Sequence, residues 1–162
     1  MQQTSFLAFQ SVANEIDAPV LLSRVGLRKT ATMIALLQCL ARQSAPVTHR
    51  YLAEELSLTG HEPSTVFRCL RRFEEKGLVA RLDLGEHLDR YELADGILGE
   101  ETGTHPHFLC TVCGDVFCLR EQTSRFLPKS PAELHPKIGE VSRIVLKGRC
   151  KNCCRVANNG KR

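Results

Sequence analysis

The chain has 162 residues, of which 43% are hydrophobic and 25% are charged, and its formal net charge is +4 at pH 7. This composition is typical of one medium or two small folded domains and argues against a largely disordered chain. No run approaches the ~18 apolar residues of a membrane helix, and the start of the chain lacks the basic and apolar regions of a secretory signal. We therefore expect a cytoplasmic protein with no membrane partner, whose mild positive charge permits binding to nucleic acid.

The first expected elements are helices. A short helix includes the run VLLSR and ends at Gly26, and a longer one, TATMIALLQCLARQ, has Thr30 as a suitable N-cap and an apolar face. Pro46 prevents its continuation. Thr48 is then a suitable N-cap for another short helix, HRYLAEEL, with its leucines facing inward.

The next expected helix, Ser64–Gly77, has one apolar and one basic face. Ser64 is its candidate N-cap, and Gly77 is suited to the position just after its end. The apolar face is formed by Val66, Leu70 and Phe73. The opposite face carries Thr65, Arg68, Arg71 and Arg72.

Two runs of strand-type residues, 78–84 and 88–93, follow directly and are joined by a Gly-containing turn. Helices followed by a hairpin in this order predict a winged helix over residues 1–93, whose third helix enters the major groove of double-stranded DNA. We expect Ser64, Thr65, Arg68, Arg71 and Arg72 to contact DNA, mostly at phosphates. The alternative for these arginines is an ordinary solvated face.

The second half of the chain differs in composition. Residues 94–104 are rich in Gly and in small or acidic side chains, which predicts a linker. Beyond it we expect strands at HFLC, VFCL and SRIVLKG in a small α/β domain over residues 105–154, with a disordered tail over residues 155–162. The expected fold class is α+β, with an N-terminal winged helix followed by this domain.

Two CxxC motifs, Cys110 with Cys113 and Cys150 with Cys153, carry the strongest chemical signal. Thiols in a reducing compartment serve as metal ligands more often than as disulfides, and four of them complete the tetrahedral set that structural zinc prefers. A thioredoxin-like redox pair would need a βαβ context, which neither motif has. Cys154 stays unassigned, and Cys118 remains open as a core residue, a redox-active thiol or a metal ligand.

These features together resemble the ferric uptake regulator family of metal-dependent bacterial repressors, over about Leu21 to Cys153. The most specific segments are STVFRCLRRFEEKGLV, RYEL and HPHFLCTVCGDVF. The resemblance implies a homodimeric repressor that binds palindromic operators with half-sites ~10 bp or a multiple of this apart. It also implies that the four paired cysteines hold a structural zinc in a dimerisation domain.

The resemblance further implies a second, regulatory metal at the hinge between the domains. Its ligands would be an acidic residue at the end of the wing, here Glu92, and two histidines before the first CxxC, here His105 and His107. A further histidine of the family falls on Pro46, and His49 is a possible substitute. Such donors suit Zn²⁺, Fe²⁺ or Mn²⁺. The alternative is that Glu92 is an exposed strand residue and that the two histidines form a polar strand edge.

Several positions depart from the family pattern. A family arginine is replaced by Met33, with Arg28 as a nearby basic contact. A helix of the dimerisation domain is interrupted by three prolines, Pro128, Pro131 and Pro136. A further metal site of many members is replaced by Thr104, Pro106, Arg125 and Ser142, none of which is a good ligand.

Three other functions are compatible with parts of the pattern. A relative with a decayed regulatory site would be a constitutive regulator, or a redox sensor using Cys118 or Cys154. A catalytic metal site on Glu92, His105 and His107 is disfavoured, because no further general acid or base is evident. A zinc module for protein interaction would lack salt-dependent affinity for DNA.

Overall fold

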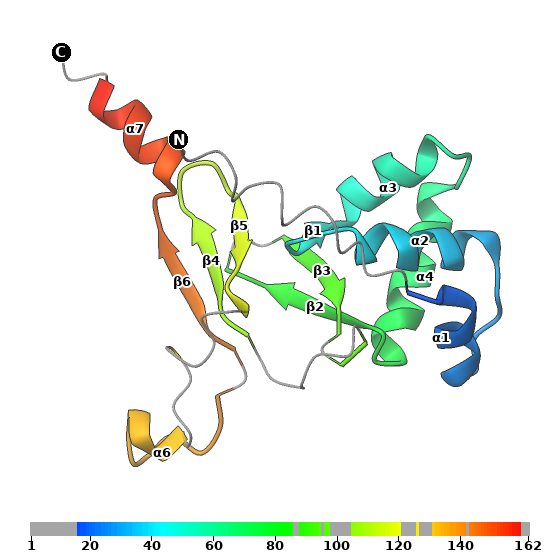
Figure 1. The fold of residues 1–162 in the computed structure, drawn as a ribbon, viewed down its shortest axis with the longest axis horizontal. Helices are drawn as coiled ribbons and strands as arrows, with labels where there is room; N and C mark the ends of the chain where they lie inside the picture. Colours follow the sequence, from blue (N-terminus) through cyan, green and yellow to red (C-terminus); the bar gives the residue numbers. More distant parts are fainter. Residues whose placement is uncertain are drawn as a thin grey trace, which may run out of the picture. The chain divides into compact units, whose positions relative to one another are not determined.

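The structure is a computed structural model that describes residues 16–85, 88–94, 96–97, 105–120, 126, 131–141 and 143–159 (Figure 1). The chain divides into two compact units, residues 1–43 with 47–101 and residues 44–46 with 102–162. The division after residue 101 falls within the expected linker, of which residues 95 and 98–104 lie outside the described residues. None of the described helices is both long enough and apolar enough to span a membrane.

Four helices form most of the first unit. They are α1 (Ala18–Arg24), α2 (Ala31–Ala41), α3 (His49–Ser57) and α4 (Pro63–Glu75). The expected caps of α2 and α3 are confirmed, because Thr30 Oγ1 accepts from the backbone N–H of Met33 at 3.3 Å and Thr48 Oγ1 accepts from that of Tyr51 at 3.2 Å. Each hydroxyl satisfies a backbone donor that has no partner within its helix.

The start of α4 differs from the prediction. The helix begins at Pro63, its N-cap is Glu62, and no side chain caps it. Ser64 therefore lies inside the first turn, where its hydroxyl donates to Glu62 Oε2 at 3.3 Å. Proline fits the first helical position because its backbone torsion is already helical and its missing N–H would have no partner there. At the other end, Gly77 follows the helix with a φ of +68°, as expected.

The apolar faces of these helices form one core. Val66, Leu70 and Phe73 of α4 have no exposed surface, which confirms the predicted apolar stripe. They belong to a buried cluster that also includes Leu22, Met33, Leu36, Leu37, Leu40, Leu52, Leu56, Leu78, Val79, Tyr91 and Leu93. This cluster holds α4 by one face and leaves its opposite face to solvent.

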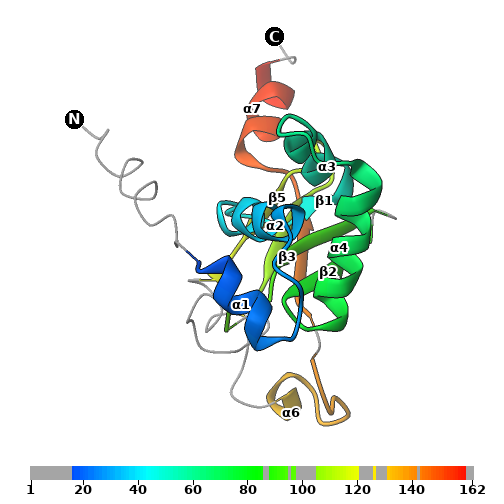
Figure 2. The same ribbon diagram turned by 90° about the vertical axis from the view of Figure 1, so that its right-hand side faces the viewer.

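A three-stranded antiparallel sheet completes the winged helix (Figure 2). The predicted hairpin is β2 (Val79–Asp83) and β3 (Asp89–Leu93), paired from Val79 with Leu93 to Asp83 with Asp89. Residues 86 and 87 of its turn lie outside the described residues. The third strand, β1 (Val47–Thr48), pairs with β3 and was not predicted, because two residues are too short to show an alternating pattern.

The second unit is built on a three-stranded sheet in the order β5-β4-β6. Its strands are β4 (His107–Cys110), β5 (Val116–Cys118) and β6 (Val145–Gly148). β5 is antiparallel to β4, and β6 is parallel to it. The expected fold class, a winged helix followed by a small α/β domain, is confirmed.

The helices of the second unit are short. Helix α6 (Pro131–Leu134) begins at one proline and ends before Pro136, which agrees with the expected interruption. Helix α7 (Lys151–Asn159) corrects the expected tail, because residues expected to be disordered from 155 are helical to Asn159. The three-residue spacing of Cys150 and Cys153 matches a helical turn, and the helix that starts there continues beyond the motif. Residues 160–162 lie outside the described residues.

Candidate metal and DNA-binding sites

The parallel pairing of β4 with β6 brings the two CxxC motifs together. Cys110 at the end of β4 is in register with Gly148 at the end of β6. The backbone N–H of Thr111 donates to Gly148 O at 2.8 Å, which extends this pairing beyond the strands. Cys150 lies two residues after Gly148, so strand register alone places the second motif beside the first.

A tight turn orients the first motif. The backbone N–H of Gly114 donates to Cys110 O at 2.9 Å, and that of Cys110 donates to Asp115 O at 2.9 Å. Gly114 has a φ of +74°, a conformation that side chains with a Cβ rarely adopt. The turn between β4 and β5 thereby directs both sulfur atoms of the motif to one point.

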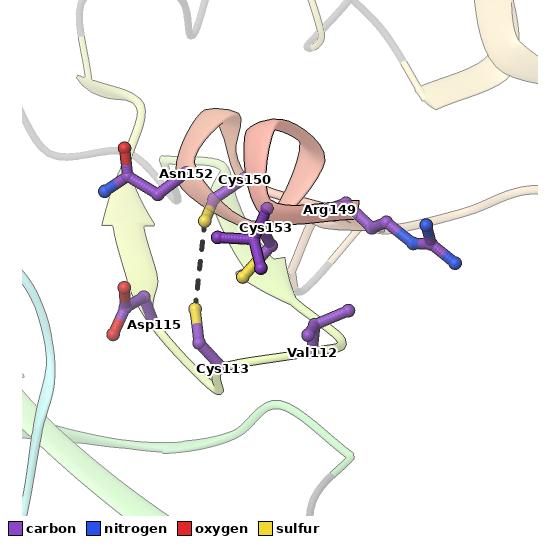
Figure 3. Close-up of a pocket in the computed structure, with 8 residues that line it drawn as sticks. Val112, Cys113, Asp115, Arg149, Cys150, Asn152 and Cys153 are labelled. Carbon is purple, nitrogen blue, oxygen red and sulfur yellow. Dashed lines mark hydrogen bonds between the residues drawn. The ribbon is translucent and has the colours of Figure 1, made fainter. Parts of the chain in front are cut away.

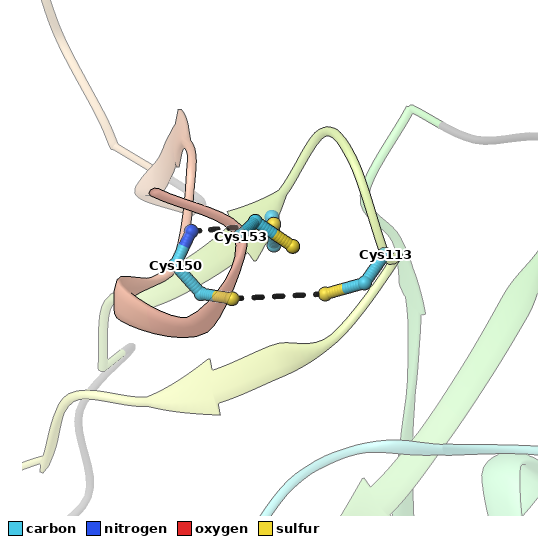
Figure 4. A group of neighbouring side chains, drawn as sticks. Cys113, Cys150 and Cys153 are labelled. Carbon is cyan, nitrogen blue, oxygen red and sulfur yellow. Dashed lines mark hydrogen bonds between the residues drawn. The ribbon is translucent and has the colours of Figure 1, made fainter. Parts of the chain in front are cut away.

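The sulfur atoms of Cys110, Cys113, Cys150 and Cys153 all lie within 4.8 Å of one another. The Sγ atoms of Cys113 and Cys150 point toward each other and are 3.8 Å apart (Figure 4). A tetrahedron with Zn–S bonds of about 2.3 Å has sulfur–sulfur edges of about 3.8 Å. The four residues therefore have the donor chemistry and the spacing of a structural zinc site.

Backbone groups stabilise the thiolate of Cys110. Cys110 has no exposed surface, and its Sγ accepts from the backbone N–H of Cys150 at 3.3 Å. Hydrogen bonds from the backbone N–H groups of Cys113 and Cys150 lower the pKa of Cys110 to about 6. Zinc binds the thiolate form, so the environment of Cys110 favours its use as a ligand.

One side of the cluster opens to solvent. Figure 3 shows the hollow beside it, which is lined by Val112, Cys113, Asp115, Arg149, Cys150, Asn152, Cys153 and Val156. Cys113 is exposed and Cys153 is half-buried, whereas Cys110 and Cys150 are buried. Cys154 points elsewhere, because its thiol donates to Arg149 O at 3.8 Å. It is thus a neighbour of the cluster and not a member.

A second group of donors lies at the other end of β4. The rings of His105 and His107 have centroids 4.5 Å apart, and the two residues are 5% and 2% exposed. One ligand atom from each, together with the sulfur of Cys118, lies within 4.8 Å of the others. Two buried imidazoles and a thiol are donors suited to a divalent transition-metal ion.

The environment of Cys118 differs from that of the buried helical cysteines. Burial alone would raise the pKa of the Cys118 thiol, but hydrogen bonds to His105 and His107, with the charges of His105 and Arg120, lower it to about 7. Burial raises the pKa of Cys39 and Cys69, which belong to the apolar core of the first unit. Cys118 is therefore more readily a thiolate than either of them.

Sequence reasoning left the role of Cys118 open, and strand register supplies what was missing. The tight turn after Cys110 pairs Leu109 with Val116, and counting outward from that pair places His107 opposite Cys118. Directly paired residues of antiparallel strands have their side chains on the same face. Counting residues outward from the CxxC turn would therefore have predicted from the sequence that Cys118 lies beside His107.

The other two predicted ligands belong to the first unit. Glu92 is a half-buried residue of β3, paired with Ala80 of β2. His49 is the first residue of α3, and its ring meets that of Phe67 edge-on at a centroid distance of 5.2 Å. Its Nε2 is buried and has no hydrogen-bond partner among the described residues. The roles of Glu92 and His49 as ligands stay predictions.

The basic face of α4 is exposed. Ser64, Arg68, Arg71 and Arg72 are exposed, Thr65 is half-buried, and their spacing places all five on one side of the helix. Arg68 Nη2 donates to Thr65 Oγ1 at 3.2 Å, so the guanidinium is held along the helix. Arg28 is also exposed and lies between α1 and α2.

Comparison with known proteins decides which family this arrangement represents. Residues 24–132 match the model of the ferric uptake regulator family. The chain belongs to this family. Ferric uptake regulators are metal-dependent transcription regulators that bind DNA as dimers and are not enzymes, so this chain is a DNA-binding repressor of that type.

Individual members of the family agree with this assignment. The chain is 28% identical over 137 residues to the ferric uptake regulation protein of Bordetella parapertussis, a match that covers 82% of this chain and 93% of the relative. The fold resembles the iron-containing regulator of Francisella tularensis, with a TM-score of 0.62, 23% identity, and coverage of 80% and 96%. It also resembles a zinc uptake regulator complexed with zinc and DNA, with a TM-score of 0.56, 21% identity, and coverage of 87% and 93%.

Replacing Cys113 by Ser should remove the structural zinc. Even changes outside the ligand shell typically weaken metal binding 10–100-fold, so loss of a ligand should exceed about 100-fold. Native mass spectrometry after mild chelation should show one zinc per chain in the wild type and none in Cys113→Ser. Cys154→Ser is the matched control and should keep its zinc. Retention of zinc by Cys113→Ser would exclude this residue as a ligand.

Proposed function

We propose that this protein is a cytoplasmic, homodimeric repressor that reads palindromic operator DNA with α4 and responds to a divalent metal ion bound by His105, His107 and Glu92. The observation that carries the proposal is the exposed basic face of α4 on a winged helix of this family. The described regions also hold two separate groups of metal-ligating side chains, one of which has structural zinc chemistry.

Contact with DNA follows from the two faces of α4. Its buried face fixes the helix to the core, and its basic face would enter the major groove, which is wide enough for an α-helix. Most of the arginines would neutralise phosphates, and one or two would read base edges. The bond from Arg68 to Thr65 orders the guanidinium before DNA binds, which lowers the entropy lost on binding.

The four-cysteine zinc would stabilise the second unit. Few of the described residues in that unit are buried apolar side chains, among them Leu109 and Val116, so its sheet would gain from another source of stability. Binding energy of a structural zinc site is folding energy, because the site does not exist in the unfolded chain. Zinc there would hold β4 and β6 together at the ends that carry the cysteines.

Metal response would depend on ligands from both sides of the linker. Glu92 precedes residues 94–104, and His105 and His107 follow them. The family resemblance supports this ligand set, and the burial of the two imidazoles fits metal coordination. A bound divalent cation would supply bonds to both sides at once. A metal ion bound by these ligands would favour one arrangement of the DNA-binding units. Occupancy of the metal site would therefore change the affinity for the operator.

Arg68→Ala should weaken operator binding by about 5–150-fold, since a specific arginine contact is worth roughly 1–3 kcal/mol. The salt dependence should also become shallower by about one phosphate contact. The measurement is fluorescence anisotropy on a duplex selected by the wild type from a random pool. Lys137→Ala, an exposed residue of the second unit, removes the same charge and should have little effect. Unchanged affinity of Arg68→Ala would remove this residue from the interface.

Replacing both His105 and His107 by Ala should abolish uptake of a second metal ion and leave the structural zinc in place. Native mass spectrometry during titration with Zn²⁺, Mn²⁺ and anaerobic Fe²⁺ counts both ions. The wild-type dimer should keep one zinc per chain and reversibly bind one more ion. His135→Ala changes an exposed histidine outside both donor groups and serves as the control. A second ion bound by the double variant would contradict the ligand assignment.

A further inference from the structure

Cys118 is the one sulfur of the described second unit that lies among imidazoles. It ends β5 opposite His107 and is half-buried. It does not belong to the four-cysteine cluster, and its sulfur lies within 4.8 Å of ligand atoms of His105 and His107. The sequence left it open as a core residue, a redox-active thiol or a metal ligand.

We propose that Cys118 is a ligand of the regulatory metal, and that its sulfur makes this site selective for Zn²⁺ over Mn²⁺ and Fe²⁺. The inference rests on the proposed function, in which His105 and His107 bind that ion. It goes further by adding a donor and by naming the metal.

Strand geometry directs all three donors to one face. His107 is the first residue of β4 and His105 lies two residues before it, and residues at this spacing project to the same side of extended chain. Cys118 is the direct cross-strand partner of His107, so it shares that face. Backbone pairing thus positions the donors, independently of any metal.

The distances are those of a site that closes with small side-chain movements. Bonds of about 2.0–2.1 Å to nitrogen and 2.3 Å to sulfur separate the donors of a tetrahedral zinc by roughly 3.3–3.8 Å. The present upper limit of 4.8 Å is about 1 Å longer. Rotations of the side chains are sufficient to bring three donors from that spacing onto one ion.

A purely structural role does not explain this position. Cys39 and Cys69 show what core cysteines look like in this protein, because both lie within the apolar cluster of the winged helix. Cys118 instead adjoins two imidazoles that are almost completely buried. A sulfur placed between buried nitrogen donors is typical of a metal site.

The sulfur also determines the preferred ion. Zn²⁺ accepts thiolate and imidazole together, whereas Mn²⁺ is better suited to carboxylate, carbonyl and water ligands. Intrinsic affinities also rise from Mn²⁺ through Fe²⁺ towards Zn²⁺. Two imidazoles and a thiolate reinforce this preference for Zn²⁺. In the proposed set, Glu92 is the fourth donor.

Cobalt(II) provides a direct probe, since thiolate ligation gives an intense charge-transfer band in the near ultraviolet. The dimer with zinc in its four-cysteine site is titrated with Co²⁺, and mass spectrometry of the same sample verifies that this zinc is retained. We expect a charge-transfer band that grows to one Co²⁺ per chain in the wild type and in Cys154→Ser. Cys118→Ser should bind Co²⁺ without the band, and its zinc affinity should fall by more than about 100-fold.

A second variant tests selectivity. Cys118→Asp places an oxygen donor at the same position, and the ratio of Zn²⁺ to Mn²⁺ affinity should fall at least tenfold relative to the wild type. A second ion that requires His105 and His107 but gives no charge-transfer band in the wild type would overturn the role of Cys118 and leave the proposed function intact. Failure of the wild type to bind any second ion would overturn both.

Discussion

The pairing of β4 with its two neighbours is the constraint that positions both groups of candidate metal ligands in the second unit. This strand has four residues, with His107 at its first position and Cys110 at its last. Its parallel partner β6 supplies the second CxxC motif, and its antiparallel partner β5 supplies Cys118. The two groups of donors therefore share one structural element. If structural zinc stabilises this sheet, it also stabilises the arrangement of the donors at the opposite end, so the first metal is a precondition for response to the second.

The DNA-binding surface depends on a different principle, the separation of two faces on one helix. Val66, Leu70 and Phe73 fix α4 in the core, and the exposed face carries its arginines. Net charge contributes little to this specificity. A zinc ion held by four thiolates contributes −2, which takes the formal +4 of the chain to about +2. Attraction to phosphate must therefore be local, and in the proposed function the exposed arginines of α4 would provide it.

Local chemistry predicted much of this fold, and pairing between distant residues explains what was missed. Thr30, Thr48 and Gly77 marked helix ends correctly because capping involves only neighbouring residues. Ser64 was assigned wrongly because Pro63 already occupied the first helical position. The four cysteines were recognisable from spacing alone. The neighbourhood of Cys118 required the register of β4 with β5, and β1 was too short to have a pattern.

In the proposed function, metal occupancy and operator binding are coupled, and thermodynamic linkage makes this coupling testable in either direction. The measurement is the zinc affinity of the regulatory site, determined in a metal buffer with and without saturating operator DNA. Couplings of this kind are typically about 5–150-fold. We expect operator DNA to raise zinc affinity by the same factor by which zinc raises operator affinity. Equal zinc affinities with and without operator would disprove the coupling, because linkage requires that a metal which strengthens DNA binding is itself bound more tightly when DNA is present.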